Sequence, residues 1–326
     1  MQIIKKCTPF EIQKAAKALV DGKLVAFPTE TVYGLGADAT NQSAIARIYS
    51  IKARPVNHPL IVHISSINQV EKWATDISEY ALDLARHFWP GPITLIFKRS
   101  GLAFDAVTGG QDSVGLRVPS NPVALNLLAE FEKLGGSGVA APSANRFGSV
   151  SPTSAKAVGA ELGIFMEERD LILDDGQCLI GIESTIVDCT KAVPIVLRPG
   201  AVTIEMIEQA TGLKNTFDFG GQKVRASGQM ASHYSPKAVV KLGMPTQQGD
   251  GFIALADIAT PSGALRLAAP TNIEEYARDL YEALRLGDEL GLEKVFAIVP
   301  IGGGLAVAIR DRLTKAASDK QVDRLG

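Results

Sequence analysis

Cysteine is scarce in this chain of 326 residues, which has three: Cys7, Cys178 and Cys189. So few thiols at such wide spacing exclude a disulfide framework and a C-x-x-C metal site. They are typical of a protein in a reducing compartment, and we therefore expect a cytoplasmic location. Their expected role is packing in or near the core.

Long apolar runs and an excess of one charge are missing as well. No run approaches the roughly 18–20 apolar residues of a membrane span, and residues 1–6 lack the apolar segment of a signal peptide. We therefore expect no association with a membrane. The formal net charge is −2 at pH 7, so no global positive field indicates nucleic-acid binding. Any site for an anion must be built locally.

The common catalytic signatures are also missing. The sequence contains no G-x-S-x-G, no H-E-x-x-H and no paired-carboxylate pattern. The spacing of the four histidines is not that of metal ligands; they are His58, His63, His87 and His233. Hydrolytic triads and zinc chemistry are therefore excluded, and we expect no metal site made of protein ligands.

Two glycine patterns do not define nucleotide sites. Gly34-x-Gly36-x-x-Ala39 begins too far after its strand, and no acidic residue follows at the required distance, so a dinucleotide fingerprint is rejected. Gly302-Gly303-Gly304 lies between an expected strand and an expected helix, where backbone N–H groups can hold a phosphate. It lacks the Lys-Ser/Thr pair of a P-loop, and a simple turn is the better interpretation.

The composition and the length of the chain indicate a globular protein with two domains. Hydrophobic residues make up 46% of the chain and charged residues 21%, and the length is too great for one ordinary core. After Leu213 the sequence becomes polar and glycine-bearing, with little periodicity, as far as residue 236. We predict a first domain of residues 1–212, a linker of residues 213–237 and a second domain of residues 238–326.

The first domain mixes strands and helices without strict alternation. Thr8 and Pro9 start a helix that Gly22 ends, and Asn41 caps another that runs to about residue 51. The stretch from Thr29 to Gly36 is expected to be a polar loop. Further strands are expected at 23–27, 60–64, 93–98, 114–118, 139–141, 171–173, 184–188 and 195–198, and further helices near 121–131, 153–160 and 203–211. The pattern predicts an α/β (α+β) domain with a mixed sheet flanked by helices.

The second domain has a simpler pattern. Strands are expected at 238–242, 251–256 and 294–299, and helices at 272–290 and 305–317. This order predicts a small α/β domain of under about a hundred residues.

Two cations one residue apart, Lys52 and Arg54, lie between the end of an expected helix and an apolar strand. An isolated K-x-R is usually a solvated loop. Here the pair indicates a clamp for a dense anion such as a phosphate chain, because other polar segments occur at strand ends further along the chain. These segments contain Arg117, Ser143, Asn145, Ser151, Ser184, Thr185, Arg198, His233 and Tyr234. Together they suit a pocket for a nucleoside triphosphate and a small polar substrate.

The ordered motifs define a resemblance. PTETVYGLGADA, KARP-x-x-x-PLIVHI, GLRVP, APSAN-x-x-G-x-VSPT, STIVD, LRPG and SHYSP follow one another with the expected gaps. The sequence resembles the YrdC-like family of L-threonylcarbamoyladenylate synthases, in the long form with an extra C-terminal domain. The match covers residues 1–212 most strongly. It implies a large domain with a twisted mixed sheet and a small Rossmann-like second domain.

The resemblance implies the reaction and its partners. L-threonine and bicarbonate form N-carboxythreonine, which attacks the α-phosphate of ATP to give threonylcarbamoyl-AMP and pyrophosphate. ATP is a substrate, with Mg²⁺, and no prosthetic group is implied. The adenylate then passes to a tRNA threonylcarbamoyltransferase, which modifies the adenosine beside the anticodon. A direct contact with tRNA or other double-stranded RNA is left open. Because the nucleophile is already an anion, cations and positioning must supply most of the catalysis.

The same resemblance assigns roles to residues by motif. Lys52 and Arg54 hold the phosphates and the incoming carboxylate. The implied threonine-binding residues are Thr31, His63, Arg117, Ser184 and Thr185. The implied ATP-binding residues are Lys52, Arg54, His58, Ser143, Asn145, Ser151, Arg198, His233 and Tyr234. Their linker members, His233 and Tyr234, suggest that the linker is a lid over the pocket, against the alternative of a passive tether.

Two departures from the family pattern are visible. Position 58, often Asn in the family, is His58 here, which weakens its expected contact with the nucleotide. Ala231 and Ser232 stand where many members have basic residues, so this linker adds less positive charge.

Three other functions compete with the synthase. A non-enzymatic RNA-binding module is disfavoured by the net charge of −2. Carbamoyl transfer in metallocluster maturation is disfavoured because such proteins carry C-x-x-C zinc modules. A purely structural protein is disfavoured by the ordered polar motifs.

Overall fold

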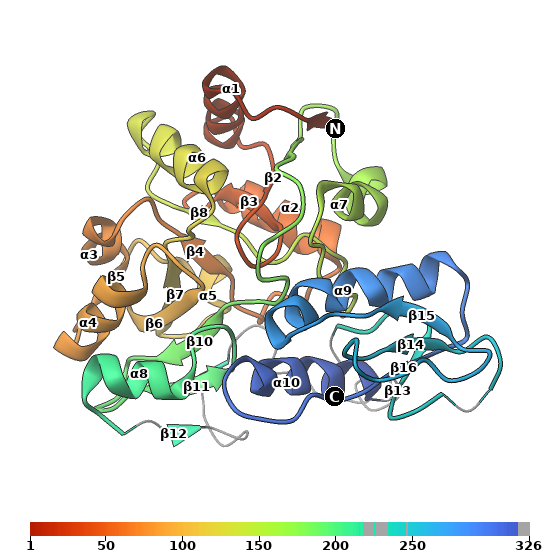
Figure 1. The fold of residues 1–326 in the computed structure, drawn as a ribbon. Coiled ribbons are helices and arrows are strands. Elements are labelled where there is room, and N and C mark those ends of the chain that lie inside the picture. Colours follow the sequence, from red (N-terminus) through yellow and green to blue (C-terminus); the bar gives the residue numbers. More distant parts are fainter. Residues whose placement is uncertain (215, 218–223, 226–233, 246, 319–326) are drawn as a thin grey trace.

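The computed structural model describes residues 1–214, 216–217, 224–225, 234–245 and 247–318. Two domains lie side by side, a large one that holds the N-terminus and a small one built from the C-terminal part of the chain (Figure 1). His233 lies outside the described residues, so its predicted place at the nucleotide site stays a prediction.

A twelve-stranded mixed sheet forms the frame of the large domain. Its strands are β1 (Gln2–Ile4), β2 (Val25–Phe27), β3 (Gly34–Asp38), β4 (Ile61–His63), β5 (Ala74–Thr75), β6 (Ile93–Arg99), β7 (Ser113–Arg117), β8 (Val139–Ala140), β9 (Leu171–Leu173), β10 (Thr185–Asp188), β11 (Ile195–Arg198) and β12 (Thr216–Phe217). The order is β1-β9-β2-β3-β8-β4-β7-β6-β10-β11-β12, with β5 paired to β6. Parallel and antiparallel pairs occur in the same sheet, for example β4 with β7 and β6 with β7. The predicted mixed sheet is confirmed.

Two helices of the large domain, α1 (Pro9–Val20) and α2 (Gln42–Lys52), begin at the caps Thr8 and Asn41 that the sequence indicates. The other helices are α3 (Val70–Trp73), α4 (Glu79–Phe88), α5 (Asp105–Thr108), α6 (Pro122–Lys133), α7 (Ala155–Leu162) and α8 (Ile204–Thr211), with short 3₁₀ turns at Ile67–Gln69 and Gly163–Phe165. Thr8 accepts a bond from the backbone N–H of Glu11, and Asn41 accepts one from that of Ala44. Gly22 has the positive φ of +73° that a helix C-terminus favours.

Helices cover both faces of this sheet. Successive side chains of a strand point to opposite faces, so neighbouring residues pack against different helices. Val25 and Phe27 of β2 share a buried cluster with Leu19 of α1 and Phe131 of α6. Residues of the opposite face, such as Leu35 and Leu116, share a second cluster with Ile48 of α2 and Leu84 of α4. The sheet is therefore a buried middle layer, and its loops are held rigidly at the strand ends.

One local prediction is wrong. The stretch from Thr29 to Gly36 is not a loop throughout, because β3 begins at Gly34 and pairs with β2 and β8. A Cβ on Gly36 would approach Phe27 and Val139 to 2.8 Å, so the close packing of the strands requires glycine there. Within the expected linker, β12 pairs in parallel with β11.

The small domain is a four-stranded parallel sheet with two helices. Its strands are β13 (Val239–Leu242), β14 (Gly251–Ile253), β15 (Leu265–Ala268) and β16 (Lys294–Ala297), in the order β13-β16-β14-β15. Its helices are α9 (Ile273–Glu289) and α10 (Leu305–Ala317). Strand β15 is absent from the sequence prediction. The α/β character is as predicted, and the more specific Rossmann-like description stays a prediction.

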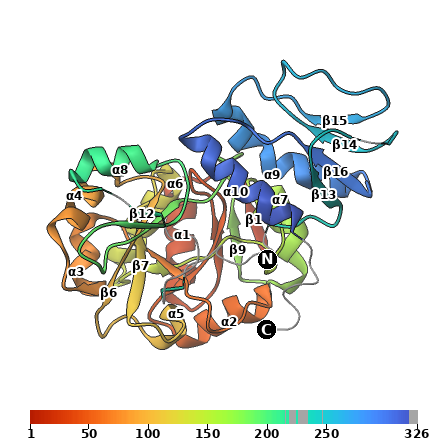
Figure 2. The same cartoon turned by 90° about the horizontal axis from the view of Figure 1, so that it is seen from below.

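The two helices of the small domain lie between its sheet and the large domain (Figures 1 and 2). One buried cluster crosses the boundary: it joins Val32, Val150 and Ile182 of the large domain to residues of α9 and α10 such as Leu280 and Leu313. The two domains therefore share part of a hydrophobic core and are not joined by the linker alone.

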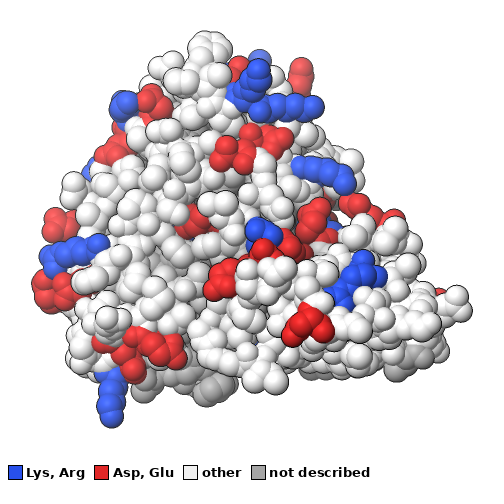
Figure 3. Space-filling model, in the orientation of Figure 1, with Lys and Arg blue, Asp and Glu red and all other residues white. Residues whose placement is uncertain are grey.

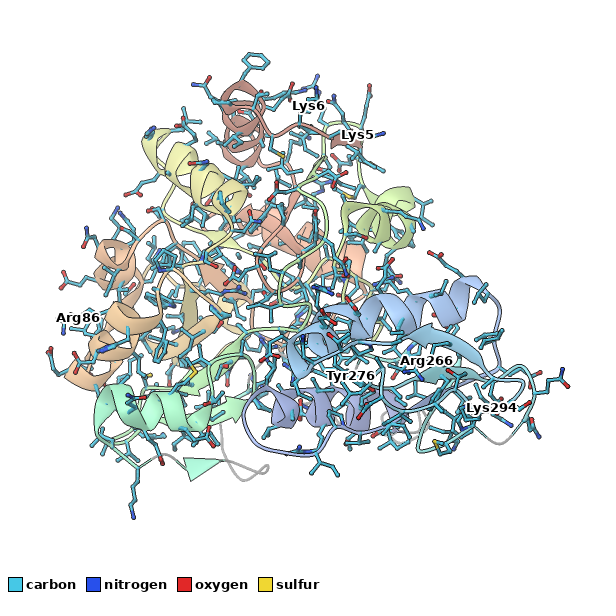
Figure 4. All side chains as sticks on the ribbon, viewed as in Figure 1. Lys5, Lys6, Arg86, Arg266, Tyr276 and Lys294 are labelled. Carbon is cyan, nitrogen blue, oxygen red and sulfur yellow. The ribbon has the colours of Figure 1, made fainter. Side chains whose placement is uncertain are left out.

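α/β sheets often bind ligands at the carboxyl ends of their parallel strands. In the small domain, its own side chains occupy this region. Arg266 donates to the backbone oxygens of Ala254, Leu255, Ile258 and Ala268 at 2.7–2.9 Å. Tyr276 donates to Ile298 O at 2.9 Å, and both residues lie within the small domain (Figure 4). Arg310 donates to the backbone oxygens of Pro300 and Gly302, which fits the glycine run as a turn.

Positive and negative side chains are interspersed on the face of the molecule shown in Figure 3, without a broad patch of one sign. No helix in the described part of the chain is long and apolar enough to cross a membrane.

The three cysteines are free thiols.

Candidate active site

A pocket that is open to solvent lies in the large domain at the ends of several strands. The predicted site residues in its lining are Thr31, Arg54, His63, Arg117, Ser143, Ser184, Arg198 and Tyr234. They come from segments that are far apart in the sequence, and the mixed sheet brings them together. The lining also contains residues that the sequence analysis did not select, including Thr29 and Glu183.

The loop between β2 and β3 is locked by a hydroxyl network. Thr29 Oγ1 accepts bonds from the backbone N–H groups of Thr31 and Val32 and donates to Val32 O at 2.6 Å. It also lies 2.8 Å from Thr31 Oγ1. Both threonines are buried, so the Thr31 hydroxyl is presented to the pocket in a fixed position.

His63 and Arg117 form one wall of the pocket, because they are register partners at the ends of the parallel strands β4 and β7. Burial, followed by the charge of Arg117, lowers the pKa of His63 to about 3. The imidazole is therefore neutral at pH 7 and suits hydrogen bonding better than ion pairing.

Glu30 fixes Arg117 and was missed in the sequence analysis. Its Oε1 lies 2.8 Å from Arg117 Nη2, and its Oε2 accepts from the backbone N–H of Ser120. Glu30 stands inside the PTETVYGLG motif, between the two threonines. Its position in that motif was the available signal, but a carboxylate is not expected beside an anion site.

Lys52 and Arg54 lie on either side of a left-handed residue, Ala53, with φ 49°. Arg54 lines the pocket; its Nη2 donates to Pro59 O at 2.9 Å and its guanidinium lies 5.6 Å from the Phe147 ring centre. Burial lowers the pKa of Arg54 to about 10, so it stays charged at pH 7.

Lys52 lies behind the pocket wall. Its Nζ donates to Ser143 O at 2.6 Å and to Asn145 O. Burial, followed by the nearby Arg54, holds the pKa of Lys52 well below its usual range. Lys52 thus fastens the turn that carries Ser143 into the pocket, and a contact with phosphates stays a prediction.

Two further predicted ATP residues, Asn145 and Ser151, are buried but outside the lining. Asn145 Nδ2 donates to the backbone oxygens of Arg146 and Ser149 at 2.7 and 2.8 Å. Ser151 donates to Glu183 at 2.5 Å. In the described structure both residues organise the loop around the pocket.

Ser184 and Thr185 have different surroundings. Ser184 lines the pocket, where its backbone O and its Oγ accept from Arg198 at 3.0 and 3.2 Å. The hydroxyl of Thr185 instead donates to Val202 O at 2.7 Å. Gly200 makes this packing feasible, because a Cβ there would come within 2.4 Å of the Thr185 nitrogen. The structure thus brings Ser184, and not Thr185, to the pocket.

His58 is half-buried beside the pocket and is not part of its lining. Its ring packs edge-on against Phe147, with 5.2 Å between ring centres. Burial and the nearby Arg54 and Arg225 lower its pKa. Its contact with nucleotide stays a prediction.

Tyr234 reaches the pocket from the end of the expected linker. It is buried, with a left-handed φ of 62°, and stacks on Tyr281 of α9 with 5.7 Å between ring centres. The backbone N–H of Ser235 donates to Gly148 O, which fastens this segment to the large domain. A tyrosine of the linker therefore lies at the pocket.

Another described part of the linker crosses the same face of the sheet. Arg225 exchanges hydrogen bonds with Gln111 and donates to the backbone oxygens of Asn57 and Gly109. It borders a second hollow of about 310 Å³, which shares Ile61 with the main pocket.

The electrostatics of the pocket favour an anionic ligand. Three buried arginines, Arg54, Arg117 and Arg198, and one carboxylate, Glu183, line it. Glu183 is paired with Arg312, and Glu30, which lies outside the lining, is paired with Arg117. Among the described residues, no group of three or more His, Cys, Asp or Glu side chains is arranged to hold a metal. The arrangement can bind charged oxygens and orient a small polar ligand; it offers no hydrolytic triad.

The fold and the pocket define a two-domain α/β protein with a buried, arginine-lined anion site. A family profile described as "Telomere recombination", covering Sua5, YciO and YrdC, matches residues 17–200, and one described as "Threonylcarbamoyl-AMP synthase, C-terminal domain" matches residues 202–318. The chain therefore belongs to the two-domain YrdC/Sua5 family.

Relatives match over nearly the full length. Proteins named threonylcarbamoyl-AMP synthase from Pyrococcus abyssi and Bacillus subtilis are each 36% identical, over 97% and 96% of this chain and 97% and 94% of their own. The crystal structure of Pyrococcus abyssi Sua5 complexed with L-threonine has a TM-score of 0.86 and 36% identity, covering 97% of both chains. A Mycobacterium tuberculosis protein named putative threonylcarbamoyl-AMP synthase is 37% identical over 64% of this chain and 93% of its own.

Proposed function

We propose that this protein is a threonylcarbamoyl-AMP synthase. It joins L-threonine, bicarbonate and ATP to give threonylcarbamoyl-AMP, pyrophosphate and water, for the threonylcarbamoyladenosine modification of tRNA. The observation that carries the proposal is the pocket, in which three arginines and several fixed hydroxyls meet, in a chain that matches synthases from end to end.

The chemistry fits a site without a strong base. Threonine and bicarbonate condense to N-carboxythreonine with loss of water. Its carbamate oxygen attacks the α-phosphorus of ATP, the bond from this phosphorus to the bridging oxygen breaks, and pyrophosphate leaves. In the attack on the α-phosphorus both reacting groups are anions, so the barrier of that step is lowered chiefly by fixed positive charge and by orientation. Buried arginines are suited to this because they stay protonated and offer several donors in a rigid plane.

The proposal assigns the pocket residues to two ligands. Thr31, His63 and Arg117 lie together and offer a hydroxyl, a neutral imidazole and a guanidinium, which suit an amino acid with a hydroxyl side chain. Arg54 and Arg198 suit the phosphates. Lys52 holds the backbone of Ser143 and Asn145, and the Asn145 side chain holds the backbone of Arg146 and Ser149. Tyr234 of the linker is part of the lining.

The remaining expectations belong to the same proposal. Mg²⁺ would enter with the nucleotide, held by its phosphates. No prosthetic group is needed for this chemistry. Transfer of the adenylate to a tRNA threonylcarbamoyltransferase, a contact with tRNA or other double-stranded RNA, and a cytoplasmic location stay predictions.

The test is an RNA-free assay with ATP, L-threonine and bicarbonate. Threonylcarbamoyl-AMP should be detected by mass spectrometry together with pyrophosphate, and its formation should need all three substrates. A folded protein that binds RNA and forms no adenylate would contradict the proposal and favour an RNA-binding module.

A further inference from the structure

The carboxylate of Glu183 lies in the pocket lining, 6% exposed, and two of its three hydrogen-bond donors come from the second domain. Ser151 Oγ of the large domain donates to Oε1 at 2.5 Å. Tyr281 Oη of α9 and Arg312 Nε of α10 both lie 2.9 Å from Oε2. The wall of the pocket is therefore completed across the domain boundary.

Arg312 is fully buried and touches the pocket from behind at more than one point. Its Nη2 donates to Pro199 O at 3.1 Å, next to Arg198 in the chain. Its guanidinium lies 5.2 Å from the ring centre of Tyr234, which also lines the pocket. One side chain of the second domain thus contacts the Glu183 carboxylate, the backbone beside Arg198 and the linker tyrosine.

A carboxylate in this position is unfavourable for a site that binds a polyanion. Its charge would repel the phosphates and would attract Arg198, whose Nη2 donates to the adjacent Ser184. Burial alone would raise the pKa of Glu183, but Arg312 and then Arg198 outweigh it and lower this pKa to about 2. The carboxylate is therefore ionised at pH 7, and its charge has to be balanced within the protein.

We propose that Arg312, assisted by Tyr281, is a positioning residue of the nucleotide site: it neutralises Glu183 and holds it on the domain boundary, so that Arg198 is kept for the phosphates of ATP. The inference rests on the proposed function and adds a role for the second domain within it. Among the described residues, this carboxylate accepts hydrogen bonds from Ser151 of the large domain and from Tyr281 and Arg312 of the second. The second domain thus supplies the cation that bonds to Glu183 directly, and the same guanidinium also pairs with Asp311.

The test compares Arg312→Gln, Glu183→Gln and the double variant in the full-length protein. Arg312→Gln should raise KM for ATP by about tenfold or more, because Glu183 then turns to Arg198. KM for L-threonine should change much less. In the double variant the uncompensated carboxylate is gone, and KM for ATP should return most of the way to the wild-type value.

The matched control is Arg310→Gln. Arg310 is on the same helix and bonds to Pro300 and Gly302 of its own domain, so its loss should leave KM for ATP unchanged. If Arg312→Gln does not fold, Tyr281→Phe removes a single hydroxyl donor to Glu183 and should raise KM for ATP severalfold, again reversed by Glu183→Gln.

The rescue separates charge compensation from mere support of the fold. A structural role for Arg312 predicts a double variant that is no better than Arg312→Gln, and this result would overturn the inference. Equal changes in KM for ATP and for threonine would also overturn it. Both results require an active wild type; a wild type without synthase activity would instead contradict the proposed function.

Discussion

Glu30 and Arg117 form a buried ion pair across the pocket wall, with 2.8 Å between Oε1 and Nη2. Arg117 in turn stands beside His63 at the ends of neighbouring strands. The carboxylate holds the guanidinium in one orientation, so the arginine can receive a ligand carboxylate without having to be ordered first. This pre-organisation is the basis of the threonine side of the proposed site.

Arg54→Ala should reduce adenylate formation by about 10²-fold or more, because a fixed positive charge at the reacting phosphates is lost. The fold should be intact by circular dichroism. Arg86→Ala is the control, since Arg86 is exposed on α4, pairs with Glu79 and Asp83, and lies at the edge of the large domain (Figure 4). Near-wild-type turnover of folded Arg54→Ala would remove this residue from the catalytic assignment.

Lys52→Ala should also abolish adenylate formation, but with a second effect. Lys52 Nζ holds the backbone oxygens of Ser143 and Asn145, so its loss leaves buried acceptors unpaired. We expect the free energy of unfolding to fall by about 2 kcal/mol or more, measured by urea denaturation. Unchanged stability together with lost activity would instead support a direct contact of Lys52 with the phosphates.

The protein should select threonine over valine. Valine fills the same volume but leaves the fixed Thr31 hydroxyl and its neighbours without the partner that the threonine hydroxyl supplies. A site built for a hydroxyl rejects the analogue that lacks it, by about 10²-fold or more in kcat/KM. Turnover should be compared in saturating bicarbonate, and equal values for the two amino acids would disprove a dedicated hydroxyl contact.

Acid should destabilise the protein partly through His63. Its pKa is about 3 in the folded protein, against about 6.5 in an unfolded chain, so the unfolded state binds more protons between these values. The stability from burying the neutral imidazole is complete above about pH 6.5. It falls by up to about 1.4 kcal/mol per pH unit towards pH 3.

The check is the free energy of unfolding of wild type and His63→Gln between pH 7 and pH 4. The wild type should lose stability more steeply than the variant over this range. Parallel curves would show that His63 does not stay neutral in the folded protein.

The linker should act as a lid. Tyr234 lies in the pocket lining, and Arg225 is bound to the same face of the large domain. ATP with threonine should therefore protect residues 225–236 from proteolysis, and Tyr234→Ala should lower activity by impairing exclusion of water from a labile adenylate. Unaltered cleavage in the presence of both substrates would favour a passive tether.

Deletion of residues 213–326 should impair catalysis for the same reason. The truncation also uncovers Val32, Val150 and Ile182, which are packed against the second domain, so its stability has to be measured in parallel. An isolated first domain that makes threonylcarbamoyl-AMP at the full-length rate would show that the linker has no catalytic role.

Local signals in the sequence predict much of the fold. Thr8, Asn41 and Gly22 mark helix ends because capping depends on neighbouring residues. Strand β3 was missed because its glycines read as a loop, whereas tertiary packing against Phe27 and Val139 is what requires them. Strand β15 was missed because it is half-exposed at the edge of a small sheet.

For the site as well, the sequence predicts residues that lie in continuous motifs and misses contacts between residues that are far apart in the chain. The ordered motifs locate the pocket residues, since most of these lie in continuous stretches at strand ends. The partners of Glu183 could not be found in this way, because Tyr281 and Arg312 are 98 and 129 residues away in the sequence. Likewise Lys52 and Thr185 lie within motifs, but their side chains turn to backbone oxygens that only the fold places nearby.

The most direct test of the whole account is a structure of the protein with L-threonine and a non-hydrolysable ATP analogue bound. Threonine should lie against Thr31, His63 and Arg117, with the phosphates against Arg54 and Arg198 in the same pocket. Ligands bound elsewhere, or a pocket that stays empty at saturating concentrations of both, would contradict the assignment of this pocket as the active site.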